Sequence, residues 1–318
     1  MSAEHAAKAT QKIRVAAPAG VVYGLIADAV KWPLYFSPTA HVEQLEFDGE
    51  RERLRMWSLM DGRLKSWISW RHLDPVERRV EFRQELPASP LNSVGGTVTV
   101  RPFGPQDTEL ELLYDFSLDG DLPADVEWSE RATDGVSRTN LTDLKGFAER
   151  WTRLDDLVLS FEESVRINGP AELVYDFLYR AGDWPGLVPH VARVDLTEEA
   201  PGVQRMTMEA VTEHGSHTTE SVRICFPHAG RIIYKHTTTA PLLEAHTGEW
   251  CVAPDETGVT VFAQHNVVLR EEDIAAVLGE HVGLAQARWH VREALSRHSL
   301  ALLEQARKHA ESAVRMLG

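Results

Sequence analysis

The sequence predicts an α+β fold in two tandem domains, each a curved antiparallel sheet wrapped around a long C-terminal helix. The first observation behind this prediction is an internal repeat with a constant offset. The repeated pairs, each 152 residues apart, are Pro18 and Pro170, Tyr23 and Tyr175, Trp32 and Trp184, Phe82 and Tyr234, and Gly96 and Gly248. A repeat of this length is a duplicated domain, because solenoid units are far shorter. We therefore divide the chain into domains at residues 1–155 and 156–318.

The second observation is the order of elements, which is the same in both copies. Each copy begins with a short strand, at 12–16 and 163–167. A helix follows the repeated proline, since proline favours the first helical position, and a Trp-Pro pair starts a second short helix or turn. Six strand-like segments follow in the first copy, near 42–48, 52–60, 64–73, 78–86, 95–101 and 108–117. Their counterparts in the second copy lie near 192–198, 203–213, 217–226, 230–238, 246–253 and 257–268.

The third observation is a long helix that closes each copy, predicted over about 134–155 and about 272–315. In the first copy its stripe consists of Val136, Asn140, Leu144, Phe147 and Trp151. The stripe of the second copy consists of Leu295, Ser299, Leu302 and Ala306. An antiparallel sheet that curls around such a helix leaves a cavity between them. The element order therefore predicts a pocket protein.

Composition excludes several classes of function. The 318 residues suit two domains of ordinary size, and a net charge of −15 opposes non-specific binding to nucleic acid. The sequence shows no signal segment and no apolar run long enough to span a bilayer. Both cysteines, Cys225 and Cys251, lie in the second copy, so a disulfide framework is not needed and we expect a cytoplasmic location. Eleven of the 14 histidines follow residue 158, but their spacing matches no metal motif, and we expect neither a metal nor a cofactor.

The sharpest local feature is a strand-like segment at 67–71. Its period of two places Trp67, Ser69 and Arg71 on one face and Ile68 and Trp70 on the other. On alternation alone, the simpler interpretation is that the apolar pair faces the core and that Ser69 and Arg71 face water. The duplicate opposes this interpretation, because a solvated face would not demand that Ser and Arg recur. The corresponding residues are Thr219, Ser221 and Arg223.

Four motifs together identify a family that the chain resembles. They are the start of the first helix at Pro18 to Tyr23, the pair Trp32-Pro33 followed by Phe36-Ser37, the Trp-x-Ser-x-Arg strand, and Arg138-Thr139-Asn140 on the closing helix. The combination resembles the polyketide aromatase/cyclases of bacterial type II polyketide synthases. These are helix-grip proteins, also described as START-like or Bet v 1-like. The duplicated arrangement is similar to the di-domain subclass, and the resemblance covers essentially the whole chain.

The resemblance implies a catalytic site in the first domain. It makes Arg71 the principal catalytic group and places Ser69, Trp67 and Asn140 around the same cavity, with Trp32 beside them. The chain departs from single-domain relatives at Thr39, where they place a catalytic-site tyrosine. The corresponding second-domain residues are Arg223, Ser221, Thr219, Val191 in place of the tyrosine, and His298 or Ser299 in place of the asparagine.

The reaction that the resemblance implies is closure of the first ring of a poly-β-ketone between carbons 7 and 12, or its dehydration and aromatisation, or both. The substrate would be carried on the phosphopantetheine arm of an acyl carrier protein. We expect Arg71 to stabilise negative charge on carbonyl oxygens, with water or substrate oxygens beside it because no carboxylate partner is evident. We also expect Arg71→Ala to abolish cyclisation and leave the fold intact.

Two other hypotheses remain open at this point. The same cavity could serve a non-catalytic carrier of a hydrophobic small molecule, since one fold hosts many functions. A carrier should have an almost wholly apolar lining, whereas a cyclase should direct Arg71, Ser69 and Asn140 inward. One domain could also catalyse while the other only supports it. The second domain is the candidate for that lesser role, because it lacks the counterparts of Asn140 and Trp67.

Overall fold

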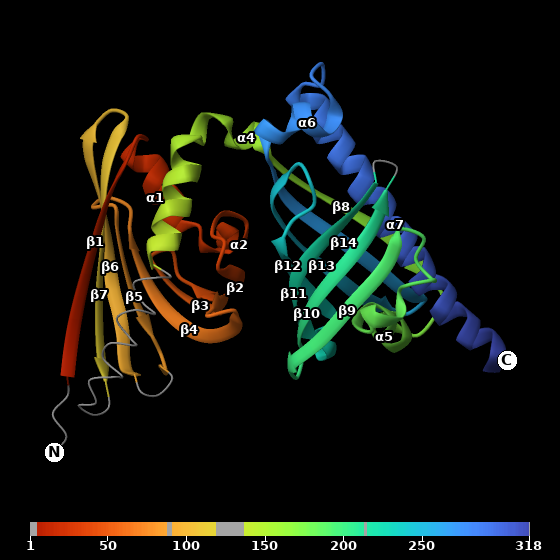
Figure 1. Cartoon of the computed structure of the whole chain (residues 1–318). Coiled ribbons are helices and arrows are strands. Elements are labelled where there is room, and N and C mark those ends of the chain that lie inside the picture. Colours follow the sequence, from red (N-terminus) through yellow and green to blue (C-terminus); the bar gives the residue numbers. More distant parts are fainter. Residues whose placement is uncertain (1–4, 88–90, 119–136, 213–214, 318) are drawn as a thin grey trace. The chain divides into compact units, whose positions relative to one another are not determined.

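The computed structural model describes residues 5–87, 91–118, 137–212 and 215–317. The chain divides into two compact units, Met1–Leu154 and Asp155–Gly318. Each unit contains one seven-stranded antiparallel sheet, and the two sheets have the same strand order (Figure 1). Among the described residues, no helix combines the length and the apolar character needed to cross a membrane.

In the first unit the sheet order is β1-β7-β6-β5-β4-β3-β2. The strands are β1 (His5–Val15), β2 (Thr39–Phe47), β3 (Arg51–Met60), β4 (Arg63–Asp74), β5 (Arg79–Gln84), β6 (Leu91–Gly104) and β7 (Asp107–Leu118). The helices are α1 (Ala19–Ala27), the 3₁₀ turn η1 (Ala29–Lys31), α2 (Trp32–Tyr35) and a closing helix over 137–149. Strand β1 is longer than predicted because it pairs with β7 along its whole length, which outweighs the low strand propensity of its alanines and lysines. Pro18 is the N-cap of α1 and not its first residue.

The second unit repeats this topology in the order β8-β14-β13-β12-β11-β10-β9. Its strands are β8 (Val158–Ile167), β9 (Val191–Ala200), β10 (Val203–Thr212), β11 (Gly215–Phe226), β12 (Arg231–Thr238), β13 (Leu243–Asp255) and β14 (Gly258–Leu269). Its α-helices are α5 (Ala171–Tyr179), α6 (Ile274–Leu278) and α7 (Leu284–Leu317). Short 3₁₀ turns lie at η3 (Ala181–Asp183), η4 (Pro227–Ala229) and η5 (Glu271–Asp273).

The closing helices differ from the prediction at their ends. The single helix expected over 272–315 is interrupted at Gly279, whose φ of 105° is incompatible with a continuing helix. In the first unit the helix gives way to the turn η2 (Trp151–Arg153) and the short helix α4 (Leu154–Leu157). Trp151 is 38% exposed, so it does not belong to the buried stripe as predicted. Val136 lies outside the described residues.

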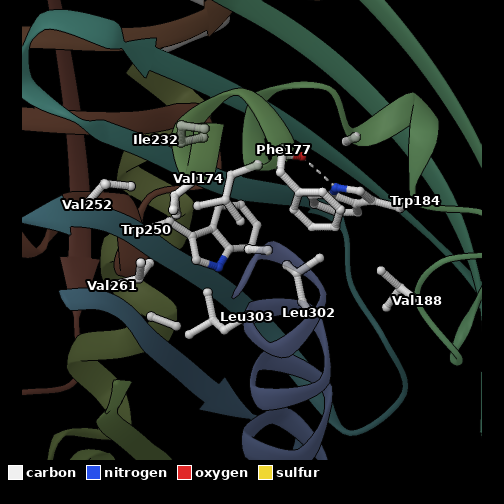
Figure 2. Close-up of a cluster of buried hydrophobic side chains, with 14 of the residues drawn as sticks. Val174, Phe177, Trp184, Val188, Ile232, Trp250, Val252, Val261, Leu302 and Leu303 are labelled. Carbon is white, nitrogen blue, oxygen red and sulfur yellow. Dashed lines mark hydrogen bonds between the residues drawn. The ribbon is translucent and has the colours of Figure 1, made fainter. Parts of the chain in front are cut away.

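Each unit has its own apolar core between the sheet and the closing helix. In the first unit Leu141, Leu144 and Ala148 of the closing helix pack with Val22 and Ile26 of α1. In the second unit Figure 2 shows Leu302 and Leu303 of α7 close to Trp250 of β13. The two cores are separate, so each half of the duplication carries what it needs to hold its own cavity.

In each unit a repeated glycine, Gly96 in β6 and Gly248 in β13, leaves room for the aromatic ring on the neighbouring strand. A Cβ atom at Gly248 would lie 2.3 Å from the Tyr234 hydroxyl oxygen and 2.3 Å from the Gln264 carbonyl oxygen. The same crowding exists at Gly96, where a Cβ atom would meet the Leu113 carbonyl oxygen at 2.2 Å. The glycine therefore fixes where the ring on the neighbouring strand can sit.

We predict that Gly248→Ala destabilises the protein by about 1–3 kcal/mol, because backbone and ring must both move to admit one methyl group. Gly182→Ala is the matched control, since a Cβ atom there meets nothing within 4 Å. Thermal unfolding of the full chain measures both. Equal unfolding temperatures for the two variants would contradict this account.

Candidate active site

The first unit encloses a cavity of about 180 Å³ between its sheet and its closing helix. Most of its lining is apolar, with side chains such as Ile26, Phe36 and Leu112. The polar groups are few and come from separate elements. All six first-domain residues that the sequence singled out line this cavity: Trp32, Thr39, Trp67, Ser69, Arg71 and Asn140.

The two faces of β4 are now assigned. Ser69 and Arg71 are each only 3% exposed and point to the cavity with Trp67, whereas Trp70 on the opposite face is 40% exposed. The solvated interpretation of Ser69 and Arg71 is therefore wrong, and the recurrence of both residues in the duplicate gave the better signal.

Arg71 is held by protein groups on three sides. Its Nη1 lies 2.8 Å from Oε1 of Glu52, which stands directly opposite on β3, and its Nη2 donates to the Ile26 carbonyl oxygen at 2.7 Å. The guanidinium also lies over the Trp32 ring, 4.7 Å from its centroid. The sequence-based expectation that Arg71 lacks a carboxylate partner is wrong. The partner was missed because the pairing depends on strand register.

Burial sets the electrostatics of this arginine. Desolvation lowers the pKa of Arg71 to about 10, and the nearby Glu52 carboxylate opposes that shift. The guanidinium therefore remains charged at neutral pH. Nε and Nη1 of Arg71 and Oε1 of Glu52 make no hydrogen bond, so the contact with Glu52 is an ion pair and part of the donor fork is unused.

The second unit contains the same arrangement with one substitution. Arg223 donates to Oε1 of Gln204 at 2.7 Å, and Gln204 occupies the place of Glu52 on the neighbouring strand. The Leu178 carbonyl accepts from Arg223 as Ile26 does from Arg71. Trp184 lies under the guanidinium as Trp32 does in the first unit. We call the arginine, its strand partner, the helix carbonyls and the tryptophan the arginine brace.

Arg223 does not lie where the sequence suggested. It is fully buried and, unlike Arg71, is not among the residues that line the cavity of its unit. Its described contacts, with Gln204 and the α5 carbonyls, are those of a structural brace. The catalytic role predicted for Arg223 therefore has no geometric support, since the side chain has no surface facing the cavity.

A phenol that sequence reasoning missed lines the first cavity. Thr39 leaves no tyrosine at the expected place, but Tyr114 of β7 presents its ring from another strand. Burial raises the pKa of Tyr114, while a hydrogen bond with the Ser137 side chain acts in the opposite direction. Across the cavity, Oδ1 of Asn140 is buried without a hydrogen-bond partner. The first cavity therefore offers a permanent cation, a neutral phenol and an amide.

The second cavity, of about 100 Å³, has a different lining. The predicted residues Thr219, Ser221, His298 and Ser299 all line it. Sequence reasoning missed that six histidines meet there: His190, His217, His236, His246, His265 and His298. The uneven distribution of histidine along the chain was the available signal, but the residues lie on four strands, a helix and a turn, so no local spacing groups them.

Hydrogen bonds and ring stacking connect most of these histidines. The Nε2 atom of His265 lies 2.7 Å from Oγ of Ser299, and its Nδ1 lies 2.9 Å from the Tyr234 hydroxyl and 3.1 Å from Nε2 of His246. The His246 ring stacks on His236 with centroids 4.5 Å apart. Hydrogen bonds therefore link His246, His265 and Ser299, while His236 joins them by ring stacking.

Burial keeps these imidazoles neutral. It lowers the pKa of His190, His236, His265 and His298 to about 4, and for His298 the neighbouring His190 adds to the effect. Burial together with the adjacent histidines lowers the pKa of His246 well below its ordinary value. Within the described residues, no group of three His, Cys, Asp or Glu side chains converges as metal ligands do. At neutral pH the cluster is therefore uncharged.

The comparisons with known proteins agree with this architecture. Residues 6–149 and 158–305 each match the family described as polyketide cyclase/dehydrase and lipid transport. The chain is 39% identical over 303 residues to the granaticin polyketide synthase bifunctional cyclase/dehydratase of Streptomyces violaceoruber, covering 95% of this chain and 93% of the relative. It is 39% identical over 305 residues to the actinorhodin counterpart of Streptomyces coelicolor, covering 92% and 94%.

Two solved structures resemble the whole chain. The di-domain aromatase/cyclase BexL of the BE-7585A biosynthetic pathway shares 43% identity with a TM-score of 0.85, covering 96% of this chain and 99% of that one. The di-domain aromatase/cyclase StfQ of the steffimycin pathway shares 30% identity with a TM-score of 0.82, over the same shares of the two chains.

Two tandem helix-grip domains, each with a cavity between sheet and closing helix, define a di-domain helix-grip protein, and the predicted fold is confirmed. The chain belongs to the polyketide cyclase/dehydrase family and is a di-domain polyketide aromatase/cyclase. The predicted enzyme class is likewise confirmed.

We predict that Glu52→Gln preserves the fold, because Gln204 already serves the corresponding arginine in the second unit. Glu52→Ala should cost about 3–5 kcal/mol, since it leaves the Arg71 charge buried without its partner. Urea unfolding of the full chain distinguishes the two variants. The brace would not have the role described here if Glu52→Ala were as stable as Glu52→Gln.

We predict that acid destabilises the second unit before it affects the first. The unfolded chain binds protons on histidine below about pH 6.5, whereas the folded unit excludes them until about pH 4. Stability is therefore complete above pH 6.5 and is lost as the pH falls, by about 2 kcal/mol at pH 5 for one such imidazole. Unfolding temperatures between pH 7.5 and pH 5 measure this loss, and it should shrink in His236→Gln. A profile that is flat over this range would contradict the prediction.

Proposed function

We propose that the first cavity closes the first ring of a poly-β-ketone tethered to an acyl carrier protein, joining carbons 7 and 12. The observation that carries the proposal is the lining, which is apolar except for Arg71, Tyr114, the amides Asn140 and Gln84, and a few hydroxyl groups. Such a lining folds a carbon chain and presents donors to its ketone oxygens at a few fixed points. The relatives from the granaticin and actinorhodin systems, named polyketide synthase bifunctional cyclase/dehydratases, support the same substrate class.

The size of the cavity fits one ring and not a whole chain. An apolar cavity of about 150 Å³ holds one benzene molecule, and the first cavity measures about 180 Å³. The remainder of a long poly-β-ketone must then extend beyond it, as a substrate attached to a carrier protein would. Holding the chain bent in this space brings the reacting carbons together, which removes much of the entropic barrier to ring closure.

The charged groups suit the aldol step. When an enol carbon attacks a ketone carbon, the new carbon–carbon bond leaves negative charge on the ketone oxygen. Arg71 supplies a permanent positive charge at the cavity wall, where the low dielectric strengthens its effect. Tyr114 stays protonated because burial raises its pKa, so it can donate to that oxygen. Asn140 can accept from an enol hydroxyl through its unpartnered Oδ1.

The carrier hypothesis fits the cavity less well. The polar content that was set as the discriminator, with Arg71, Ser69 and Asn140 on the lining, favours the enzyme.

The structure also changes the choice of test variant. Arg71→Ala would remove the brace that ties β4 to α1, so the earlier expectation that it leaves the fold intact is not supported. Asn140 is better, because its side-chain oxygen has no protein partner to lose.

We predict that Asn140→Ala lowers formation of the correct first ring by about 10–100-fold with little change in unfolding temperature. The measurement is product analysis with a minimal polyketide synthase, run with and without its ketoreductase. Thr142→Ala, an exposed position on the same helix, is the control. An unchanged product profile for Asn140→Ala would count against the first cavity as the site of ring closure.

A further inference from the structure

The two cavities differ in whether their linings contain a base, which the loss of water from a ring requires. Along the described lining of the first cavity there is no imidazole, carboxylate, amine or thiol, and Arg71 and Tyr114 are its ionisable groups. Neither is a base at neutral pH. The second cavity presents six imidazoles, and imidazole is the side chain most often used to take and return a proton.

The second cavity also contains polar atoms that the protein leaves without partners. They are Nδ1 of His236, Oγ of Ser221, Oγ1 of Thr219 and Nε1 of Trp250, all buried and without hydrogen bonds. These residues line the same cavity from β11, β12 and β13. Because buried polar groups are nearly always hydrogen-bonded, their convergence indicates a ligand with several oxygen atoms.

Space for such a ligand continues beyond the cavity itself. An adjoining hollow of about 350 Å³ shares His217, Ala240, Leu295 and His298 with it. A ring held in the hollow can therefore direct an oxygen-bearing edge toward the imidazoles. His236 meets that edge beside Ser221, which is its cross-strand partner.

We infer that the second-domain cavity is a second active site, in which His236 removes water from a cyclic β-hydroxy ketone. Nδ1 of His236 takes the proton from the carbon next to the ketone, and the electrons of that C–H bond form the ring double bond. The C–O bond to the hydroxyl breaks, the imidazolium returns the same proton to the departing oxygen, and water leaves. No oxidant, reductant or metal is needed, and the imidazole ends neutral.

The surroundings of His236 support this step. Its ring stacks flat on His246, with 3° between the planes, and His246 is fixed in turn by His265 and Ser299. The reacting ring is thus oriented by a network that reaches α7. Burial lowers the pKa of His236 to about 4 and a backbone hydrogen bond with Thr238 opposes the shift, so the imidazole is neutral at neutral pH. The inference rests on the proposed function only for the origin of the ring, since the elimination itself is separate chemistry.

The first unit supplies substitutions that the fold accepts. Gln84 occupies in the first domain the place of His236, so His236→Gln exchanges one cavity lining for the other. We expect the full-length variant to form the first ring but to lose water from it at least 100-fold more slowly, so that a product heavier by one water accumulates. His228→Gln removes an exposed imidazole outside the cavity and is the control.

A synthetic ring with a hydroxyl β to its ketone separates this inference from the proposed function. Wild type and Asn140→Ala should both dehydrate it, seen as the absorbance of the conjugated ketone, whereas His236→Gln should not. Tyr234→Phe, which copies Phe82, should act like wild type if His236 alone carries the proton. Dehydration by His236→Gln at the wild-type rate, with its unfolding temperature unchanged, would overturn the inference even if ring closure in the first cavity holds.

Discussion

The structure depends on a buried arginine that ties the middle of each sheet to the end of the first helix. Arg71 and Arg223 are both almost completely removed from solvent, where an unpaired charge would be very unfavourable. Each is compensated by a strand neighbour, by the carbonyl groups at the C-terminal end of a helix and by the face of a tryptophan. Helix carbonyls carry partial negative charge, so a cation is stabilised there.

The arginine brace fixes the position of a tryptophan that lines each cavity. The tryptophan that it covers donates its indole N–H to the first helix, at Leu25 in one unit and at Phe177 in the other, both at 3.0 Å. The helix, the Trp-Pro turn and the fourth strand are therefore held as one body. In the first unit the same arginine also reaches the cavity, so one charge both holds the fold together and faces the substrate.

The two units share the brace and an apolar core, but the linings of their cavities differ. Gln84 and Val94 of the first cavity correspond to His236 and His246 of the second. At a further position, Tyr114 pairs with Gly96 across the ladder as His265 pairs with Gly248. These exchanges lie on the cavity lining, so they change its chemistry while the brace and the core stay the same. The first cavity has a mostly apolar lining with one permanent charge, whereas the second cavity is lined by neutral imidazoles.

The sequence by itself determined the duplication, the strand order and the inward face of the fourth strand. Hydrophobic periodicity is local and gave the order of elements, but on its own it favoured the wrong face of the fourth strand. The recurrence of Ser69 and Arg71 in the duplicate indicated the inward face, because a repeated residue points to a shared constraint. Asn140 was also found from sequence, since an amide on an apolar helical stripe must face something polar.

Only the tertiary structure decided which residues meet. Glu52 becomes the partner of Arg71 through the register of two strands, and Tyr114 reaches the cavity from a strand that gave no motif. The six histidines that line the second cavity are scattered over more than 100 residues and are brought together by the pairing of strands and the packing of α7. Periodicity gives the face of a side chain but not its neighbour across the sheet. The pairing of distant strands supplies that neighbour, and no local pattern encodes it.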